Sequence, residues 1–416
     1  MKSYFDFSGK DCFEYDESDC IGQLKTPCYI IDQNKFDSIS ESLLKSFHNI
    51  WNGPVVAGYS IKTNSLPWII THLKKKGYYA EVVSEQEYLL AKHLGFKDNE
   101  IIINGPVKTE ALLINSLNNG AIVNLDNSND IDILERNIHK AKKTWDVGLR
   151  YNFLLENECP NETIVGSEHS RFGFCIENGE FEQAIKRINN IPAININGLH
   201  GHNSTKSKSL NIFKAIAKKA FTIINSYNLD VQYIDIGGGF YGDKPGAPTF
   251  SEYAEAISTF FAQKNNITLI VEPGASIISS PISYLCKVIN NKYVNNKCFT
   301  TLNGSIIHID PLMHGIQFQK LFYHKRSNPI TDKLFKQELC GFTCIEMDRL
   351  GNIDLPFPLL PDDMVSFKNC GSYSMTLSPL FINYFPPVYV YDGNNYKTVR
   401  HAWDENDYIS KCEVDE

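Results

Sequence analysis

A repeated pattern, an apolar strand followed by an amphipathic helix, is the feature of this sequence that most constrains its fold. Strand-like runs at 55–61, 78–83 and 121–125 each precede a segment in which apolar residues recur at helical spacing. The pattern recurs about eight times between residues 36 and 280. Strands that alternate with helices form parallel sheets, and at this count and length a (β/α)8 barrel is the economical solution.

The sequence changes character after residue 280. Its apolar segments become short and rich in β-branched or aromatic residues, and turn residues separate them. Two of the separators, Asn303-Gly304 and Asp392-Gly393, are pairs that favour hairpin turns. We therefore expect a C-terminal antiparallel β-sandwich or β-barrel domain over 281–416, after a barrel domain over 36–280.

Composition and charge argue against several classes of protein. The net charge of -8 disfavours nucleic acid or an anionic membrane as a partner. Apolar runs such as 267–271 are far too short to span a bilayer. Eleven scattered cysteines and an N-terminus without a visible signal peptide favour reduced thiols in the cytoplasm. Cys340 and Cys344 lack partners at metal-ligand spacing, so we expect no zinc site there.

Lys62 stands at the C-terminal tip of an apolar, strand-like run that begins at Val56. If its ammonium group is desolvated there, its pKa falls and the neutral amine can attack a carbonyl carbon. The alternative is a lysine that has simply reached solvent at the end of its strand. Active sites of barrel enzymes lie at the C-terminal ends of the strands, which is where this lysine falls.

Two histidines, His200 and His202, lie two residues apart at the end of another expected strand. Side chains at this spacing point to the same face of a strand, so the two could form a metal-binding pair. Alternatively, one histidine packs inside the barrel and the other faces a ligand. The metal is the less favoured interpretation because no carboxylate or third histidine accompanies the pair in the sequence.

Three consecutive glycines, 237–239, follow the strand-like run 231–236. Backbone N–H groups of a loop without side chains can converge on an anion. Three glycines also lose much backbone entropy on folding, and a loop that binds no ligand seldom needs all three. The pattern favours phosphate binding over a merely flexible connection, although no Walker-type Gly-Lys-Ser/Thr sequence is present.

A carboxylate, Glu272, follows the apolar run 269–271. A charge at the mouth of an apolar strand is unfavourable unless a cation pairs with it. A protonated pyridine nitrogen would be such a cation, because the carboxylate keeps the ring charged and able to take up electrons. A salt bridge to a neighbouring strand is the alternative, and this motif alone does not decide between them.

Taken in order, six short motifs resemble the ornithine/diaminopimelate decarboxylase family, whose members are pyridoxal-phosphate enzymes of the alanine-racemase-like fold. Each motif is weak alone, but order and spacing match from about residue 25 to about residue 390. The resemblance implies a barrel, a β domain that residues 1–35 help to build, and a head-to-tail homodimer with composite active sites. The motifs are Tyr59-Ser60-Ile61-Lys62, His200-Gly201-His202, Gly237-Gly238-Gly239, Glu272-Pro273-Gly274, Gly341-Phe342-Thr343-Cys344 and Gly371-Ser372-Tyr373.

The resemblance implies a role in binding pyridoxal 5'-phosphate for each barrel motif. Lys62 would hold the cofactor covalently, and Glu272 would face its pyridine nitrogen. His202 would stack on the ring, and the backbone of 237–239 would bind the phosphate. No metal is expected.

The remaining roles that the resemblance implies fall largely on the C-terminal region. Tyr373 would reach the phosphate, and Cys344 of the other subunit would return a proton to the carbon that has lost carbon dioxide. A lone cysteine is more often a buried structural thiol, and its place in the Gly-x-x-Cys motif is what favours the catalytic role. In the barrel, Glu81 and Arg150 match supporting positions around the cofactor.

The chain departs from the family pattern where the substrate is chosen. Family members that act on diamino acids carry an acidic residue directly after the cysteine, and Ile345 occupies that position here. Glu346 follows, but a shift of one residue in a strand turns a side chain to the opposite face. Asp348 matches a later acidic position of the motif. Ala275 stands where the family commonly has an arginine after Glu-Pro-Gly.

A further departure lies in the segment 306–314, which lacks the Asp-Ala-Gly and Arg-Pro elements expected of diaminopimelate enzymes. His308 and His314 are candidates to replace them in binding the substrate. We therefore predict a decarboxylase of a modified or conjugated amino acid, as in siderophore or antibiotic assembly, rather than of plain diaminopimelate or ornithine.

The alternatives are a pyridoxal-phosphate-dependent racemase and a non-catalytic regulatory protein. The joint presence of the lysine, the carboxylate and the thiol argues against the latter, and the Gly-x-x-Cys motif favours decarboxylation.

Overall fold

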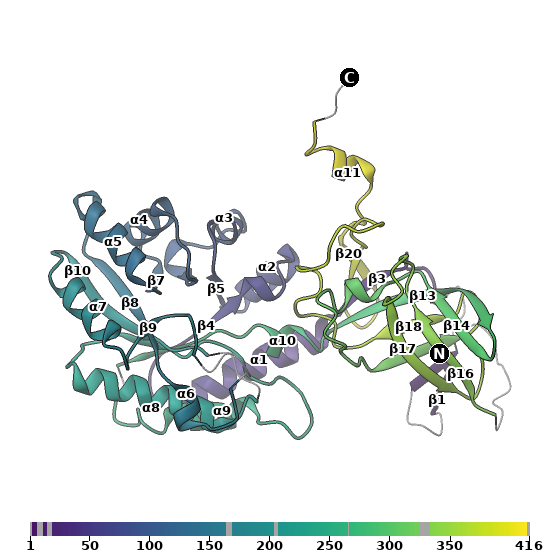
Figure 1. Cartoon of the computed structure of the whole chain (residues 1–416), viewed down its shortest axis with the longest axis horizontal. Coiled ribbons are helices and arrows are strands. Elements are labelled where there is room, and N and C mark those ends of the chain that lie inside the picture. The colour runs from purple at the N-terminus through teal and green to yellow at the C-terminus, as the bar shows by residue number, and fades with distance from the viewer. Residues whose placement is uncertain are drawn as a thin grey trace. The chain divides into compact units, whose positions relative to one another are not determined.

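The computed structural model describes residues 2–5, 11–14, 19–163, 169–203, 207–264, 266–324 and 333–413. The chain divides into two compact units, both drawn in Figure 1. One unit comprises Ser38–Ile277, and we call it the barrel unit. The other joins Met1–Asp37 to Ile278–Glu416, and we call it the β unit.

Eight parallel strands of the described residues close into a ring in the barrel unit. Each strand pairs with the next, and the last pairs with the first through Leu269 and Val55. A short strand, β9 (Phe174–Cys175), pairs with the fifth strand of the ring. This closure confirms the predicted (β/α)8 barrel. In ring order the strands are β4 (Val55–Ser60), β5 (Tyr79–Val82), β6 (Ile101–Ile103), β7 (Ile122–Leu125), β8 (Trp145–Asn152), β10 (Ile194–His200), β11 (Tyr233–Asp235) and β12 (Thr268–Val271).

Helices connect these strands, and polar side chains fix where several of them begin. Ser84, Thr109 and Thr249 each accept a hydrogen bond from a backbone N–H in the first turn of the helix that follows. The helices are α1 (Gln33–Ile50), α2 (Pro67–Lys75), α3 (Glu85–His93), α4 (Glu110–Asn119), α5 (Ser128–Asn137), α6 (Leu155–Glu158), α7 (Glu180–Asn189), α8 (Leu210–Ser226), α9 (Phe250–Ser258) and α10 (Ala275–Ile278), with 3-10 turns η1 (Ile61–Thr63), η2 (Asp98–Glu100) and η3 (Ile138–Lys140).

Side chains fill the interior of the barrel, because strands of a closed parallel sheet are buried on both faces. Ile102, Tyr233 and Ile270 pack together there from three strands. Tyr233 needs glycine neighbours: a Cβ at Gly198 would lie 2.1 Å from its ring, and one at Gly148 would lie 2.3 Å from its hydroxyl. The strands therefore read as near-continuous apolar runs in the sequence.

The β unit is built on a sheet of eleven strands among the described residues. Its long strand β13 (Ile282–Val294) runs antiparallel to β3 (Cys28–Asp32), β14 (Lys297–Leu302) and β18 (Met364–Phe367). The other strands are β1 (Lys2–Phe5), β2 (Asp11–Glu14), β15 (Lys320–His324), β16 (Phe335–Cys340), β17 (Arg349–Leu355), β19 (Val388–Tyr391) and β20 (Tyr396–Arg400); η4 (Ile306–His308) and α11 (Glu405–Ile409) complete the unit.

Most pairings in the sheet of the β unit are antiparallel, as the sequence predicted. Three of its pairings are parallel: β14 with β16, β15 with β2, and β19 with β3. Parallel neighbours need long connections, and this sheet recruits strands that are far apart in the sequence, so hairpin turns do not set all of its pairings.

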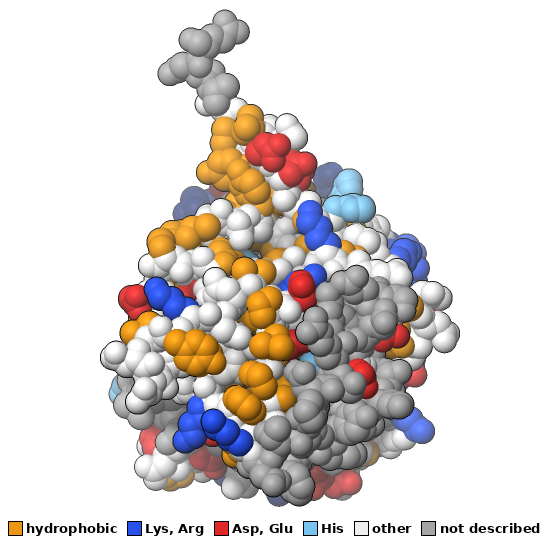
Figure 2. All heavy atoms as spheres, turned by 90° about the vertical axis from the view of Figure 1, so that its right-hand side faces the viewer, with side chains coloured by type: hydrophobic (Ala, Val, Ile, Leu, Met, Phe, Trp, Pro, Cys, Tyr) orange, Lys and Arg blue, Asp and Glu red, His pale blue; other side chains and the backbone are white. Residues whose placement is uncertain are grey.

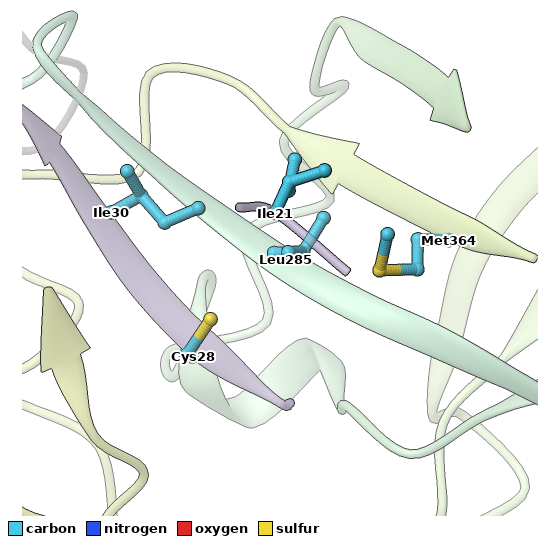
Figure 3. Close-up of a cluster of buried hydrophobic side chains, with 5 residues drawn as sticks. All are labelled: Ile21, Cys28, Ile30, Leu285 and Met364. Carbon is cyan, nitrogen blue, oxygen red and sulfur yellow. The ribbon is translucent and has the colours of Figure 1, made fainter. Parts of the chain in front are cut away.

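A small apolar cluster ties the N-terminal segment to this sheet. Cys28 and Ile30 of β3 pack with Leu285 of β13 and with Met364 and Ile21 (Figure 3). None of the eleven cysteines of the chain, Cys28 among them, forms a disulfide. Within the described ranges, no helix combines the length and apolar character needed to cross a membrane.

Candidate active site

The candidate residues of the barrel unit gather where the parallel strands end. All C-terminal ends of such strands meet on one face of the barrel. Lys62 lies in η1 directly after β4, Glu81 in β5, and Glu272 directly after β12. Direct contacts link them and bring in side chains that the sequence analysis had not selected.

Lys62 is paired with a buried carboxylate rather than simply extended into solvent. Its Nζ lies 2.6 Å from Oε2 of Glu81, whose side chain is only 1% exposed. Ser60 also donates a hydrogen bond to that oxygen, at 2.6 Å. Burial opposes ionisation of Glu81, but the charge and hydrogen bond of Lys62, with bonds from Ser60 and Asn104, outweigh it and lower its pKa. The two side chains therefore form a charged pair.

Asn104 connects the lysine pair to Glu272. Its Nδ2 donates to Oε1 of Glu81 at 3.1 Å and to Oε1 of Glu272 at 2.5 Å. Burial, followed by the charges of Asp235 and Glu81, raises the pKa of Glu272 well above its ordinary value. Asn104 was not among the residues predicted from the sequence. A polar amide directly after the run Ile101–Ile103 was the signal that could have found it.

Asp235 and His200 lie beside Glu272 in the barrel interior. One potential ligand atom from each of the three residues lies within 4.8 Å of the others, and all three side chains are buried. Nε2 of His200 is 3.9 Å from Oε2 of Glu272, and neither ring nitrogen has a hydrogen-bond partner among the described residues. The absence of a carboxylate near the two histidines in the sequence therefore does not hold in space for His200, to which the fold brings two carboxylates from other strands.

Arg150 supports the segment that carries His202. Its Nη1 donates to Oδ1 of Asp126 at 2.9 Å, and its Nη2 donates to the backbone oxygen of His202 at 3.1 Å. The guanidinium carbon also lies 4.8 Å from the centre of the Phe172 ring. Burial, followed by the positive charges of Arg150 and Lys62, lowers the pKa of His202 to about 3. The imidazole is therefore neutral near pH 7.

The glycine triplet is explained in part by packing within the chain. Gly237 has φ +68°, and a Cβ there would lie 2.6 Å from the His202 side chain. A Cβ at Gly238 would lie 2.2 Å from the backbone oxygen of Glu272. At Gly239, with φ +94°, the nearest atom would be 3.9 Å away. Two of the three glycines therefore have a steric reason that needs no ligand.

The Gly-x-x-Cys segment lies between β16 and β17 in the β unit. Cys344 and Glu346 are exposed, and Oε2 of Glu346 lies 2.7 Å from Nη2 of Arg349. Asp348 is buried and accepts four hydrogen bonds, from Ser305 Oγ, Ile306 N, Thr343 N and Thr343 Oγ1 at 2.7–3.1 Å. Its carboxylate therefore holds the loop closed.

The other candidates of the β unit differ in exposure. His308 is buried, and its Nδ1 contacts the hydroxyl of Tyr284. Burial lowers its pKa to about 4, with a smaller contribution from the charge of Arg400. His314 is exposed. Tyr373 is 45% exposed and has φ +55°, which is strained for a tyrosine; such outliers cluster at functional sites.

Comparison with known proteins places this site in a family. Residues 37–279 match the model of the pyridoxal-dependent decarboxylase, pyridoxal binding domain. A diaminopimelate decarboxylase of Zymomonas mobilis is 23% identical over 86% of both chains. An L-glutamyl-acyl-carrier-protein decarboxylase of Niallia circulans is 24% identical over 93% of this chain and 94% of its own. The crystal structure of a diaminopimelate decarboxylase of M. jannaschii superposes with a TM-score of 0.85 at 20% identity, covering 99% of this chain and 98% of the other.

Proposed function

The chain belongs to the pyridoxal-dependent decarboxylase family, and on that premise we propose that Lys62 binds the cofactor and that the substrate is an amino-acid conjugate. The protein is an amino-acid decarboxylase that uses pyridoxal 5'-phosphate. The observation that carries the assignment of Lys62 is its pairing with buried Glu81 at the strand ends of the barrel, where such sites form.

The charges of the barrel mouth fit this cofactor. Glu81, Asp235 and Glu272 are three buried carboxylates, and Lys62 is paired with the first of them. A cationic ring nitrogen beside Glu272 would supply positive charge where two carboxylates lie close together. When bound, the cofactor supplies a cationic ring that takes up the electrons of the bond broken at the substrate carboxylate.

The residues of the chain then have distinct tasks. Glu81 orients the ammonium group of Lys62, and Asn104 fixes the carboxylate of Glu272. His202 stacks on the ring as a neutral imidazole, and Arg150 with Asp126 holds the backbone of His202 in place. The backbone N–H groups of 237–239 bind the phosphate, and the local support is a run of three residues without side chains after β11.

Cys344 and Tyr373 complete the site from the β unit of a second copy. The thiol of Cys344 returns a proton to the substrate carbon, and Tyr373 binds the phosphate. The support for a homodimer is a group of exposed apolar side chains in the β unit, a kind of surface that marks interaction sites. Apolar side chains are visible on the face drawn in Figure 2. The group comprises Tyr373, Leu377, Leu380, Phe381, Ile382, Tyr384, Trp403, Tyr408 and Ile409.

Mixing two inactive variants tests this composite site. K62A and C344S, unfolded and refolded together, form mixed dimers in which one of the two sites has both native residues. About a quarter of the activity should return, since about half of the dimers are mixed. No recovery in a mixture that contains dimers would contradict the composite site.

Cytoplasmic location belongs to the same proposal, and fractionation of cells tests it.

The substrate proposal rests on Ile345 and Ala275. An apolar side chain follows the cysteine, and the acids nearby are otherwise engaged: Asp348 is buried in its loop and Glu346 pairs with Arg349. A free distal ammonium group of a diamino acid therefore has no dedicated carboxylate directly after the cysteine. His308 and His314 remain candidates to contact the substrate, and exposed His314 is the better placed of the two for a direct contact.

Trapping and a substrate panel test the proposed function. Borohydride reduction of the purified holoenzyme should add the cofactor mass to the peptide that contains Lys62. Carbon dioxide release should then be slow with free diaminopimelate and ornithine and fast with a carrier-bound or otherwise conjugated amino acid. Fast turnover of either free diamino acid would refute the substrate proposal. An inverted substrate without carbon dioxide release would instead indicate a racemase, and no reaction with any substrate would favour a regulatory protein.

A further inference from the structure

Asp235 and Glu272 form a pair of buried acids inside the barrel. They come from β11 and from the end of β12, neighbouring parallel strands. Asp235 is fully buried and Glu272 is 6% exposed. One carboxylate oxygen of each acid lies within 4.8 Å of the other. Two ionised carboxylates that close in a buried site repel each other, so one proton held between the two groups is the favoured state.

The remaining contacts of Asp235 come from donors that carry no charge. Gly237 N donates to Oδ1 at 2.9 Å, and Asn124 Nδ2 donates to Oδ2 at 3.2 Å. Asn124 is itself held by the hydroxyl of Tyr233, at 2.8 Å. These bonds fix the position of the carboxyl group but do not neutralise it.

The cations around the pair are each engaged by another carboxylate. Lys62 pairs with Glu81 at 2.6 Å, Arg150 with Asp126 at 2.9 Å, and Lys108 with Asp130 at 2.8 Å. His200 is kept neutral because burial, with the charge of Arg150, lowers its pKa well below the ordinary value. Burial raises the pKa of Asp235 to about 7, and the tyrosines nearby stay uncharged for the same reason. The titratable groups that face the pair are His200, Tyr151, Tyr233, Glu81 and Lys62.

We propose that Asp235 is a positioning residue for the proton of the cofactor ring, because it shares one proton with Glu272 and makes Glu272 a stronger base toward the ring nitrogen. The inference rests on the proposed placement of Glu272 beside that nitrogen. With the cofactor bound, Glu272 and Asp235 would release their shared proton toward the ring nitrogen and would then face its positive charge as two carboxylates. Like charges that close together hold the proton on the nitrogen more firmly than one carboxylate would.

Infrared spectroscopy of the cofactor-free wild-type protein gives the first test and needs no variant. A protonated carboxyl band should be present at pH 6 and should shift in heavy water. Glu272→Gln removes one partner and should change the band, whereas Asp98→Asn, a control acid that pairs with Lys92, should leave it unchanged. A spectrum without a protonated carboxyl at pH 6 would overturn the proposal.

The second test follows the ring proton directly in the holoenzyme. The nitrogen-15 chemical shift of labelled cofactor reports whether the ring nitrogen is protonated. Asp235→Asn should make that proton at least about tenfold more acidic, a shift of one pH unit in its titration. Thermal unfolding checks that the variant folds, since its amide must face the NH2 group of Asn124.

The outcomes separate this inference from the proposed function. A ring titration that is unchanged in Asp235→Asn but lost in Glu272→Gln would overturn the role of Asp235 and leave the proposed function intact. A ring titration unchanged in both variants would refute the placement of Glu272 itself. If Asp235→Asn does not fold, the infrared band of the wild-type protein and its change in Glu272→Gln decide whether the pair shares a proton.

Discussion

The mouth of the barrel and the loops of the β unit carry their candidate residues in opposite ways. In the barrel, a continuous chain of short contacts links exposed Lys62 to three buried side chains, those of Glu81, Asn104 and Glu272. In the β unit, Cys344 is an exposed group on a loop. The barrel thus fixes its groups through contacts between their side chains, whereas the loop, held by Asp348, leaves the thiol of Cys344 exposed.

This difference separates the two tasks of a decarboxylase. Holding a cofactor and its charges needs preorganised groups in a dry site, which a closed barrel supplies. Choosing a substrate needs side chains that can vary without disturbing a core, and surface loops allow this. Changes at the barrel mouth should therefore affect every substrate alike, and changes in the β unit should affect particular substrates or steps.

The largest expected effect is that of K62A. Loss of the amine should lower decarboxylation by at least about a thousandfold, because the group that attaches the cofactor covalently is removed. Mass analysis after borohydride treatment and carbon dioxide release measure the loss of attachment and the loss of decarboxylation. K75A, which removes an exposed lysine on α2, is the matched control and should retain full activity. Substantial activity in K62A with a trapped lysine elsewhere would contradict the assignment.

C344S should have the next largest effect, and only on turnover. A serine hydroxyl is a much weaker acid than a thiol, so kcat should fall by about a hundredfold while the cofactor absorption spectrum is unchanged. C412S is the control, since Cys412 is also an exposed free thiol. Equal turnover of C344S and C412S would remove the β-unit thiol from the mechanism and make the barrel the sole source of protons.

The sequence could predict residues whose position follows from the barrel itself. Lys62 and Glu272 were found because each directly follows an apolar strand, and strand ends converge. Asn104 was missed because its partner Glu272 lies 168 positions away and no local pattern indicates such a contact. The glycine triplet was interpreted as a phosphate loop. A Cβ atom at Gly237 or Gly238 would also collide with His202 or with Glu272, so packing within the chain explains these two glycines as well.

Asp348 shows the limit of motif reasoning in the β unit. Its position in the motif indicated a substrate contact, but its loop folds back so that the carboxylate accepts four hydrogen bonds. In D348N an NH2 group would replace one of the accepting oxygens and face hydrogen-bond donors. The substitution should destabilise the protein by about 2 kcal/mol. E346Q, at an exposed side chain, should cost less than about 0.5 kcal/mol. Denaturant unfolding measures both.

The reverse order of stability would assign the roles differently. If D348N unfolds like the wild type but raises KM for a good substrate, Asp348 contacts the substrate and the loop must open. If E346Q is the more destabilising change, its contact with Arg349 matters more than its exposure indicates. Either result would mean that residues of the β unit, like those of the barrel unit, act through specific side-chain contacts.

The smallest expected effect is a gain of stability in cofactor-free E272Q. Burial raises the pKa of Glu272 in the folded protein, so its favourable contribution is complete at acid pH and is lost as the pH rises through that raised value. Glutamine does not titrate and keeps an acceptor for Asn104. The variant should therefore match the wild type below about pH 4, where Glu272 is protonated in both the folded and the unfolded protein, and be about 0.5–2 kcal/mol more stable near pH 8. Unfolding curves at several pH values, with E346Q as the control at an exposed glutamate, measure this difference. If the difference in free energy of unfolding between E272Q and the wild type does not depend on pH, Glu272 is ionised in the folded protein. The barrel would then hold the charge of Glu272 beside that of Glu81.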